Sequence, residues 1–373
     1  MTHPNNVEPV DRDPTITRIA LGPYRPLQLI GRGGMARVYR CADTRSGAIV
    51  AVKLVKQTQR IEEDVLRRFE REIQAMKRVL HPYIVKLLDY SLSPEKSYLV
   101  MPYFAGGSVA DRLAQQLYTP REVAQMLTHL AFALDYAHNQ GYIHRDIKPS
   151  NILLDDQGQT YLSDFGLAKS LQASSVLTGT GQLFGTFAYM APEIMDGAPA
   201  DVRTDVYAMG ILLCELLAGH RPFNTDNPVA YAYLHRRAMP PSLSQLNPTV
   251  PAVLNPIVLS ALEKSPRNRP QSAGELARLF ATAVNTNRQI ADIRAPIQPR
   301  PELMLIPVKG VTSPLEPASL NPAPQTRQLN LEELEEPARQ VSGSTGSETA
   351  LMLALVIVVG VLLLVVIAVL TRR

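Results

Sequence analysis

The stretch HRDIKPSN, residues 144–151, decides how the rest of this sequence is interpreted. It places a carboxylate at Asp146, an ammonium group at Lys148 and an amide at Asn151, shortly after an apolar-patterned segment at residues 126–138. Taken alone, the stretch is equally compatible with a polar turn that follows a helix. The sequence on either side has to distinguish such a turn from a loop that carries chemistry.

Composition and charge limit the class of protein. The chain has 373 residues, 46% of them hydrophobic, which is enough for one large or two ordinary domains with a sizeable core. Its two cysteines, Cys41 and Cys214, follow no disulfide or metal-ligand spacing, which favours a reducing compartment. The net charge of +4 is scattered and not interleaved with aromatic residues, so nucleic acid is not predicted as a partner.

Composition also divides the chain into segments. Residues 1–20 are polar, contain three prolines and lack the features of a secretory signal, so we expect a disordered N-terminus. Residues 21–284 carry strand patterns followed by long helical patterns, which predicts a folded domain. Residues 285–349 are rich in proline and acidic residues and predict a disordered linker, and residues 371–373 are a short tail.

Residues 350–370, ALMLALVIVVGVLLLVVIAVL, contain no polar side chain. As a helix this segment would be about 31 Å long at ~1.5 Å per residue, which matches a hydrocarbon core of ~30 Å. Sixteen of its residues are Leu, Val or Ile, so insertion into a bilayer is favoured by roughly 5 to 10 kcal/mol. We therefore expect one transmembrane helix that anchors the protein in the cell membrane, with a buried core helix as the alternative.

The orientation of this anchor follows from weaker signals. Two arginines follow the span and only Arg339 lies shortly before it, which weakly favours a cytoplasmic C-terminus. The missing secretory signal and the unpaired cysteines favour the opposite orientation. We expect a tail-anchored protein whose folded domain lies in the cytoplasm.

The first part of the folded domain has the pattern of an antiparallel meander. Strand-like runs at residues 27–30, 38–41 and 49–55 are separated by a glycine cluster and by the turn DTRSG. The glycines would let backbone N–H groups approach a polyphosphate, although an ordinary hairpin is the commoner explanation. Lys53 alternates with apolar residues in the third run, so it needs an anionic partner, either a phosphate or a carboxylate.

The segment after the third run offers such a carboxylate. Apolar residues recur at helical spacing and predict an amphipathic helix, at positions Ile61, Val65, Phe69, Ile73 and Met76. This helix can lay Glu72 against the sheet, where Glu72 would meet Lys53. The alternative for Glu72 is a solvated helix face.

Six motifs now stand in one order along the chain: Gly31-x-Gly33 ending in Val38, Ala51-Val52-Lys53, Glu72, HRDIKPSN, DFG at residues 164–166 and APE at residues 191–193. Together they resemble the signature set of protein kinases. The likeness is strongest to the bacterial, eukaryotic-like (Hanks-type) membrane-anchored Ser/Thr protein kinases, and it covers residues 21–284. It implies an α+β, two-lobed fold, with an antiparallel sheet plus one helix in the N-lobe and a mainly helical C-lobe.

The resemblance gives each polar residue of the opening stretch a role in phosphoryl transfer from ATP. It implies that Asp146 accepts the proton of the substrate hydroxyl, that Lys148 neutralises charge on the transferring group, and that Asn151 and Asp164 bind Mg²⁺ or Mn²⁺. Lys53, held by Glu72, would contact the ATP phosphates. The other nucleotide contacts that it implies are Ile30, Gly31, Arg32, Gly33, Gly34, Val38, Ala51, Met101 and Phe104.

Two departures from the family pattern concern the nucleotide site. Ala36 stands where a third glycine is usual, which adds only a methyl group. Pro102, the residue after Met101, stands at a position where an acidic residue is common. Proline keeps the backbone carbonyl that this position would offer to ATP. Phe104 would supply a backbone N–H.

The same resemblance implies a substrate class and structural roles. Through Lys148 in DIKPSN and Thr186 before the APE motif, the resemblance implies that the protein phosphorylates Ser and Thr residues of protein substrates. We interpret four further residues as structural: His144, the pair Glu193 and Arg269, and Asp205, which would brace the loop at 144–151.

Arg145 indicates how the protein is regulated. It is a cation beside the catalytic aspartate and needs a negatively charged partner, but the segment between Asp164 and Glu193 contains no carboxylate. A phosphate on Thr178 or Thr180 would bridge Arg145 and Lys169. We therefore expect autophosphorylation of this segment, with a second copy of the kinase as the partner for reaction in trans, in membrane-associated signalling. An unphosphorylated Ser/Thr-rich loop is the alternative.

Three other classes of function compete with a kinase. A catalytically weak pseudokinase scaffold at the membrane would be favoured by loss of Lys53, Asp146, Asn151 or Asp164, and all four are present. A small-molecule phosphotransferase should lack the APE segment. An interaction protein anchored through residues 350–370 would need no metal-binding residues. The sequence does not indicate the physiological substrate or the activating signal.

Overall fold

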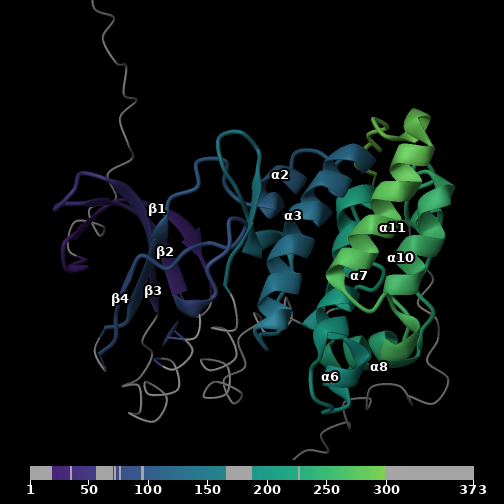
Figure 1. Cartoon of the computed structure of the whole chain (residues 1–373), viewed down its shortest axis with the longest axis horizontal. Helices are drawn as coiled ribbons and strands as arrows, with labels where there is room; N and C mark the ends of the chain where they lie inside the picture. The colour runs from purple at the N-terminus through teal and green to yellow at the C-terminus, as the bar shows by residue number, and fades with distance from the viewer. Residues whose placement is uncertain are drawn as a thin grey trace, which may run out of the picture. The chain divides into compact units, whose positions relative to one another are not determined.

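A five-stranded antiparallel sheet and a mainly helical part form the two lobes of the domain, as predicted (Figure 1). The computed structural model describes residues 19–33, 36–55, 70, 73–74, 77–93, 96–164, 187–225 and 227–298. The chain divides into two units, Met1–Met304 and Leu305–Arg373, and all of these residues belong to the first unit.

The N-lobe sheet has the strand order β1-β2-β3-β5-β4. Its strands are β1 (Tyr24–Arg32), β2 (Ala36–Asp43), β3 (Ile49–Val55), β4 (Asp89–Ser91) and β5 (Tyr98–Pro102). Side chains alternate between the two faces of a strand. One face carries a buried cluster that includes Tyr39, Val52 and Val100, whereas Val55 and Leu99 on the other face pack with Ile73.

Ile73 belongs to the amphipathic helix that the sequence predicts after β3. Residues 70, 73, 74, 77 and 78 are helical, and Ile73 is fully buried against the sheet, at 0% exposure. Glu72 and most of the remaining helix lie outside the described residues. The described part therefore supports one helix packed on the face of the sheet that also carries Lys53.

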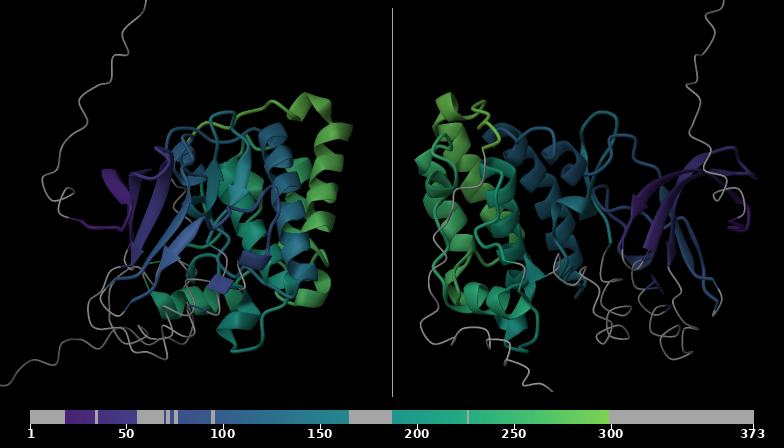
Figure 2. Two further views of the ribbon diagram at one scale, coloured as in Figure 1. Left: turned by 60° about the vertical axis from the view of Figure 1, so that its left-hand side comes forward. Right: turned by 180° about the vertical axis from the view of Figure 1, so that it is seen from behind.

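The C-lobe contains the longer helices and a two-stranded sheet. Its elements are α2 (Val109–Leu113), α3 (Pro120–Asn139), η2 (Pro149–Asn151), β6 (Ile152–Leu154), β7 (Thr160–Leu162), α6 (Pro192–Met195), α7 (Val202–Ala218), α8 (Pro228–Arg237), α9 (Leu243–Leu246), η3 (Ala252–Leu254), α10 (Asn255–Ala261), η4 (Pro266–Asn268), α11 (Ala273–Thr286) and η5 (Arg288–Ile290). Figure 2 shows α3 and α11 side by side from two directions.

Helix α7 lies at the centre of this lobe. It is buried on all sides and packs against α3, α9, α10 and α11. Gly210 allows the close approach of α10, because a Cβ atom there would stand 2.9 Å from the side chain of Leu262 and 3.0 Å from that of Ala261. The helix that presents Asp205 is therefore fixed by the hydrophobic core.

The connection between the lobes is held to β6 by backbone hydrogen bonds. The N–H of Gly106 donates to the carbonyl of Leu154 at 3.1 Å, and the N–H of Leu154 donates to the carbonyl of Gly107 at 2.8 Å. A Cβ atom on Gly106 would lie only 2.4 Å from the carbonyl oxygen of Asp155. Only glycine fits this approach, which fixes Phe104 and the segment after β5 relative to the C-lobe.

The packed domain extends beyond residue 284, where the sequence analysis placed its end. Helix α11 continues to Thr286, and residues 287–298, here called the C-terminal strap, pack against the C-lobe with Ala291 and Ala295 buried. The prediction of a linker from residue 285 was therefore too early. The apolar periodicity of the sequence ends at α11, and small alanines among charged residues give no comparable signal.

Charged groups hold the strap in place. Arg294 donates to the carboxylate of Glu122 at 3.1 Å and to the carbonyl of Leu117, and Arg121 pairs with Asp292 at 2.7 Å. Glu122 also caps α3, because it accepts from the backbone N–H of Thr119 at 2.8 Å. The strap is thus tied to the first turn of α3.

The predicted membrane anchor cannot be placed in this fold. Among the residues that the structure describes, no helix has the length and hydropathy needed to cross a bilayer. The N-terminus at 1–18, the linker from residue 299 onward, the span at 350–370 and the tail at 371–373 lie outside the described residues.

Replacing Arg294 with alanine should destabilise the full chain. We expect the free energy of unfolding to fall by about 1 to 2 kcal/mol, since hydrogen bonds between charged groups contribute about that much when they are half-buried. Denaturant unfolding followed by circular dichroism measures the change. Arg288→Ala, at an exposed position of the same strap, is the control and should change stability by less than ~0.5 kcal/mol. Equal stability of both variants would contradict a docked strap.

Candidate active site

The loop at residues 144–151 is anchored on the buried carboxylate of Asp205 in α7. Asp205 is 0% exposed. Its oxygens accept from the backbone N–H groups of His144 at 2.9 Å and Arg145 at 2.8 Å, and they contact Nε2 of His138 at 2.8 Å. Arg145 has a φ of 66°, which is unusual for a residue other than glycine. The interpretation of Asp205 as a brace for this loop is confirmed.

The imidazole of His144 links this loop to the segment that carries Asp164. Its Nδ1 accepts from the backbone N–H of Asp146 at 3.2 Å, so Nε2 carries the proton and donates to the carbonyl of Ser163 at 2.8 Å. The ring is fully buried. His144 is therefore structural, as the sequence analysis interpreted it.

The carboxylate of Asp146 meets two of the other polar groups of the loop. Nζ of Lys148 donates to both of its oxygens, at 2.9 and 2.8 Å, and Nδ2 of Asn151 donates to Oδ2 at 2.8 Å and to the backbone carbonyl at 2.7 Å. The short 3₁₀ turn η2, which begins with Pro149, brings Asn151 back toward Asp146. The structure therefore gathers into one cluster the three groups with which the sequence analysis began.

The two lobes meet at an ion pair between Lys53 and Asp164. Nζ of Lys53 lies 2.7 Å from Oδ1 of Asp164. Burial by itself raises the pKa of Asp164, but the charge and hydrogen bond of Lys53, together with weaker effects that include the charge of Lys148, outweigh it, so the pKa is lowered below its usual value. Asp164 has a φ of 61°, a second unusual backbone conformation at the site. Glu72, the partner that the sequence analysis favoured for Lys53, lies outside the described residues.

Strand register places the predicted nucleotide residues on the same face of the sheet as Lys53. Gly31 pairs with Val38, Val38 pairs with Lys53, and Ala51 pairs with Met101, and directly paired residues share a face. Gly31 lies close over Val38, where a Cβ atom would make contact at 3.4 Å. These residues form the roof over the Lys53–Asp164 pair.

The remaining nucleotide residues lie at the edges of this roof. Ile30, at 41% exposure, Arg32 and Gly33 are exposed, and Gly34 lies outside the described residues. The ring of Phe104 packs on Tyr161, with 4.8 Å between centroids. Within the part of the chain that the structure describes, the backbone N–H of Phe104 has no hydrogen-bond partner.

The donor set fits a magnesium ion bound together with a polyphosphate. The amide nitrogen of Asn151 is used by Asp146, which leaves its Oδ1 as a ligand atom, and Asp164 supplies an ionised carboxylate. Mg²⁺ prefers hard oxygen donors and usually takes one or two from the protein and the rest from phosphates and water. No cluster of three or more His, Cys, Asp or Glu side chains occurs among the described residues.

A second ion pair joins Glu193 of α6 to Arg269, which follows η4. Glu193 and Arg269 form two hydrogen bonds, at 2.8 and 2.9 Å, and Arg269 also donates to the carbonyls of Arg203, Glu263 and Lys264. The guanidinium is completely buried, and all five of its N–H donors are satisfied. The interpretation of this pair as structural is confirmed.

Four of the predicted residues in the segment after Asp164 lie outside the described residues: Lys169, Thr178, Thr180 and Thr186. Arg145 is described, and its side chain is exposed and forms no ion pair with any described residue. Sequence reasoning missed His138, Ser163 and Gly106. Each acts through a hydrogen bond or close contact to a residue far along the chain, for which the local sequence carries no signal.

Comparisons with known proteins agree with this geometry. The protein kinase domain model matches residues 24–279, so the chain belongs to the protein kinase family. Its domain is of the bacterial Hanks type, as in relatives named serine/threonine-protein kinases.

The relatives include the probable serine/threonine-protein kinase CPE1738 of Clostridium perfringens, 38% identical over 256 residues that cover 68% of this chain and 37% of the relative. PrkC, a serine/threonine-protein kinase of Bacillus subtilis, is 35% identical over 268 residues, 72% of this chain and 41% of the relative. The chain thus spans about two fifths of the length of these relatives. Among solved structures, the PknI kinase domain of M. tuberculosis matches with a TM-score of 0.59 at 26% identity, over 72% of this chain and 98% of that one.

Substitution of Lys53 should change the ionisation of Asp164. In Lys53→Met only the effect of burial and weaker charges remain, so we expect the pKa of Asp164 to rise from below to above the ordinary carboxyl value. Carboxyl ¹³C NMR during a pH titration measures it. Lys148→Met, which removes a more weakly acting cation, is the control and should raise the pKa less. An unchanged midpoint in Lys53→Met would mean that the pair does not control this charge.

Proposed function

We propose that this protein transfers the γ-phosphoryl group of ATP to serine and threonine hydroxyls of protein substrates. The observation that carries the proposal is the arrangement of two carboxylates and two lysines: Lys53 is paired with Asp164 across the lobes, and Lys148 is paired with Asp146 in the loop below. A polyphosphate and a hydroxyl can bind between these pairs. Membership of the Ser/Thr class of protein kinases supports the choice of hydroxyl.

The reaction can be written on these residues. The substrate hydroxyl oxygen forms a bond to the γ-phosphorus while the bond between that phosphorus and the β–γ bridging oxygen breaks, and ADP leaves. Asp146 orients the hydroxyl and takes its proton. Lys148, whose ammonium lies on the same carboxylate, neutralises negative charge on the group in transfer. Lys53 holds the phosphates of ATP.

The metal has a supporting part in this proposal. Asp164 and Oδ1 of Asn151 would hold Mg²⁺ or Mn²⁺, which neutralises phosphate charge when bound. The protein's own contribution is to keep Asp164 ionised, through Lys53, and to fix the orientation of the Asn151 amide, through Asp146. Both effects prepare the site before ATP binds.

The main alternative is a pseudokinase scaffold at the membrane. A scaffold needs neither the Lys53–Asp164 pair nor a carboxylate bound by both Lys148 and Asn151, and each of these contacts is made with good hydrogen-bond geometry. The kinase hypothesis therefore explains these contacts, whereas the scaffold hypothesis does not require them.

Substitutions at the site should abolish transfer without unfolding the domain. We expect Lys53→Met and Asp146→Asn each to lower the rate of ³²P transfer from ATP to a generic protein substrate by at least ~100-fold, since ~1.4 kcal/mol of lost transition-state stabilisation already costs tenfold. Lys86→Met, at an exposed lysine, is the matched control and should retain full activity. Activity of either site variant within about threefold of wild type would favour the scaffold.

We propose that phosphate on Thr178 or Thr180 activates the kinase by pairing with Arg145 and Lys169. Arg145 supports this, because its guanidinium is exposed beside Asp146 and forms no ion pair within the described part of the chain. Phosphate groups pair strongly with arginine. A second copy of the kinase would add this phosphate in trans.

This regulation predicts a measurable dependence on phosphate. After phosphatase treatment and incubation with MgATP, mass spectrometry should find phosphate on Thr178 or Thr180, and activity should recover in step. In Arg145→Ala, activity should no longer depend on that phosphate. Recovery of activity without phosphate at residues 170–186 would contradict the proposal.

We further propose that residues 350–370 anchor the protein in the cell membrane, with the kinase domain in the cytoplasm, where ATP is available. The support is compositional, since this stretch contains no polar side chain. Deleting residues 350–370 should move the protein from the membrane pellet to the supernatant and leave kinase activity intact. Deleting residues 310–330, a linker stretch of equal length, is the control and should leave the protein in the pellet. Membrane association without residues 350–370 would contradict the proposal.

A further inference from the structure

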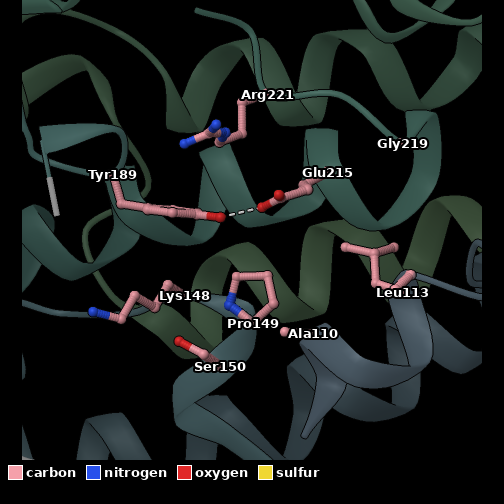
Figure 3. A pocket seen from close by; sticks show the side chains of 10 residues that line it. Ala110, Leu113, Lys148, Pro149, Ser150, Tyr189, Glu215, Gly219 and Arg221 are labelled. Carbon is pink, nitrogen blue, oxygen red and sulfur yellow. Dashed lines mark hydrogen bonds between the residues drawn. The ribbon is translucent and has the colours of Figure 1, made fainter. Parts of the chain in front are cut away.

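A pocket of about 560 Å³ opens beside the catalytic loop (Figure 3). One wall is apolar and comes from α2, with Ala110 and Leu113, and from Pro149 of the loop. The opposite wall is polar and comes from Tyr189, Glu215 of α7, and Arg221 just after α7. No catalytic or nucleotide-binding role proposed above uses the polar wall.

The pocket lies next to the reacting groups. Lys148 lines it and at the same time donates to both oxygens of Asp146, the group assigned to the substrate hydroxyl. Successive residues of an extended peptide are ~3.3 Å apart. A peptide whose hydroxyl contacts Asp146 can therefore place the side chain of a nearby residue in this pocket.

The carboxylate in the polar wall is already supplied with partners. The hydroxyl of Tyr189 donates to Glu215, the contact drawn as a dashed line in Figure 3. Burial raises the pKa of Glu215, whereas the Tyr189 hydrogen bond and the charge of Arg221 lower it in part. The guanidinium of Arg221 lies 5.9 Å from the centre of the Tyr189 ring and donates to Asn224 at 3.0 Å. The polar wall thus contains both a carboxylate, Glu215, and a cation, Arg221, whose charge acts on that carboxylate.

We propose that this pocket binds a substrate side chain close to the phosphorylated residue, and that Arg221 makes it select an uncharged, mainly apolar side chain over a basic one. The proposal rests on the proposed kinase function. A basic side chain in the pocket would be repelled by Arg221, and an acidic side chain would be repelled by Glu215. An uncharged side chain meets the apolar wall and disturbs neither charge.

Peptide phosphorylation by the full chain tests this specificity. Each peptide carries one threonine, and the three positions on either side are set in turn to leucine, arginine or glutamate. With the wild-type protein we expect kcat/KM to favour leucine over arginine by roughly tenfold at one position at least, the scale of discrimination by a single pocket contact. In Arg221→Ala the uncovered carboxylate of Glu215 should attract arginine, so this ratio should fall at least roughly tenfold.

Two further variants make the test specific. In the double variant Arg221→Ala with Glu215→Gln, the attraction for arginine should disappear again. Arg278→Ala, at an exposed arginine on α11, is the matched control and should keep the wild-type ratio. Arg221→Gln, which keeps a side chain able to donate to Asn224, should show the same loss of selectivity if Arg221→Ala folds poorly.

The outcomes separate this inference from the function on which it rests. If the wild type phosphorylates neither a peptide nor a generic protein, the kinase function itself fails. If the wild type phosphorylates both but Arg221→Ala and Arg221→Gln keep the wild-type leucine-to-arginine ratio at every position, the kinase function stands and the role of Arg221 is refuted. A wild type that prefers arginine at the pocket position would also overturn the proposal.

Discussion

The site depends on one buried carboxylate, that of Asp205. A carboxylate with no exposed surface is tolerated only when strong donors replace water, and here two backbone N–H groups and the imidazole of His138 do so. Asp205 sits in the first turn of α7, where the helix dipole also favours a negative charge. Because α7 is buried in the hydrophobic core, the core sets the position of Asp205. The backbone at His144 and Arg145 therefore has little freedom, and the positions of Asp146 and its partners follow from it.

Charge pairing then prepares the site for its ligands. Each lysine that would neutralise phosphate is held in advance by a carboxylate with its own role, Lys53 by Asp164 and Lys148 by Asp146. This arrangement pairs four charged side chains and limits the reorganisation needed when ATP and a hydroxyl bind. The polar wall of the adjacent pocket follows the same logic, because Glu215 is matched by Tyr189 and by the charge of Arg221 before any substrate arrives.

The sequence predicts the two lobes, the meander and the residues around Asp146 because short motifs carry that information locally. The sequence cannot show that His138 binds Asp205 together with the loop at 144–151, or that Arg294 donates to Glu122. Both contacts join residues that lie far apart in the chain. The strap was missed because buried alanines and scattered charges lack periodicity. The pocket at Glu215 was missed because its walls come from four separate segments, and only residues 148–150 among them belong to a recognised motif. Lys53 shows an intermediate case: the sequence required an anionic partner, and the structure supplies Asp164.

Hydrogen exchange of the backbone amides at His144 and Arg145 tests most directly whether Asp205 fixes the catalytic loop. Amides that donate to a fully buried carboxylate should open only when the lobe unfolds. NMR-detected exchange of the full chain in detergent should therefore find both amides as slow as those in the centre of α7, for example Leu212. Exchange at His144 and Arg145 on the timescale of exposed loops, while Leu212 stays protected, would contradict the account.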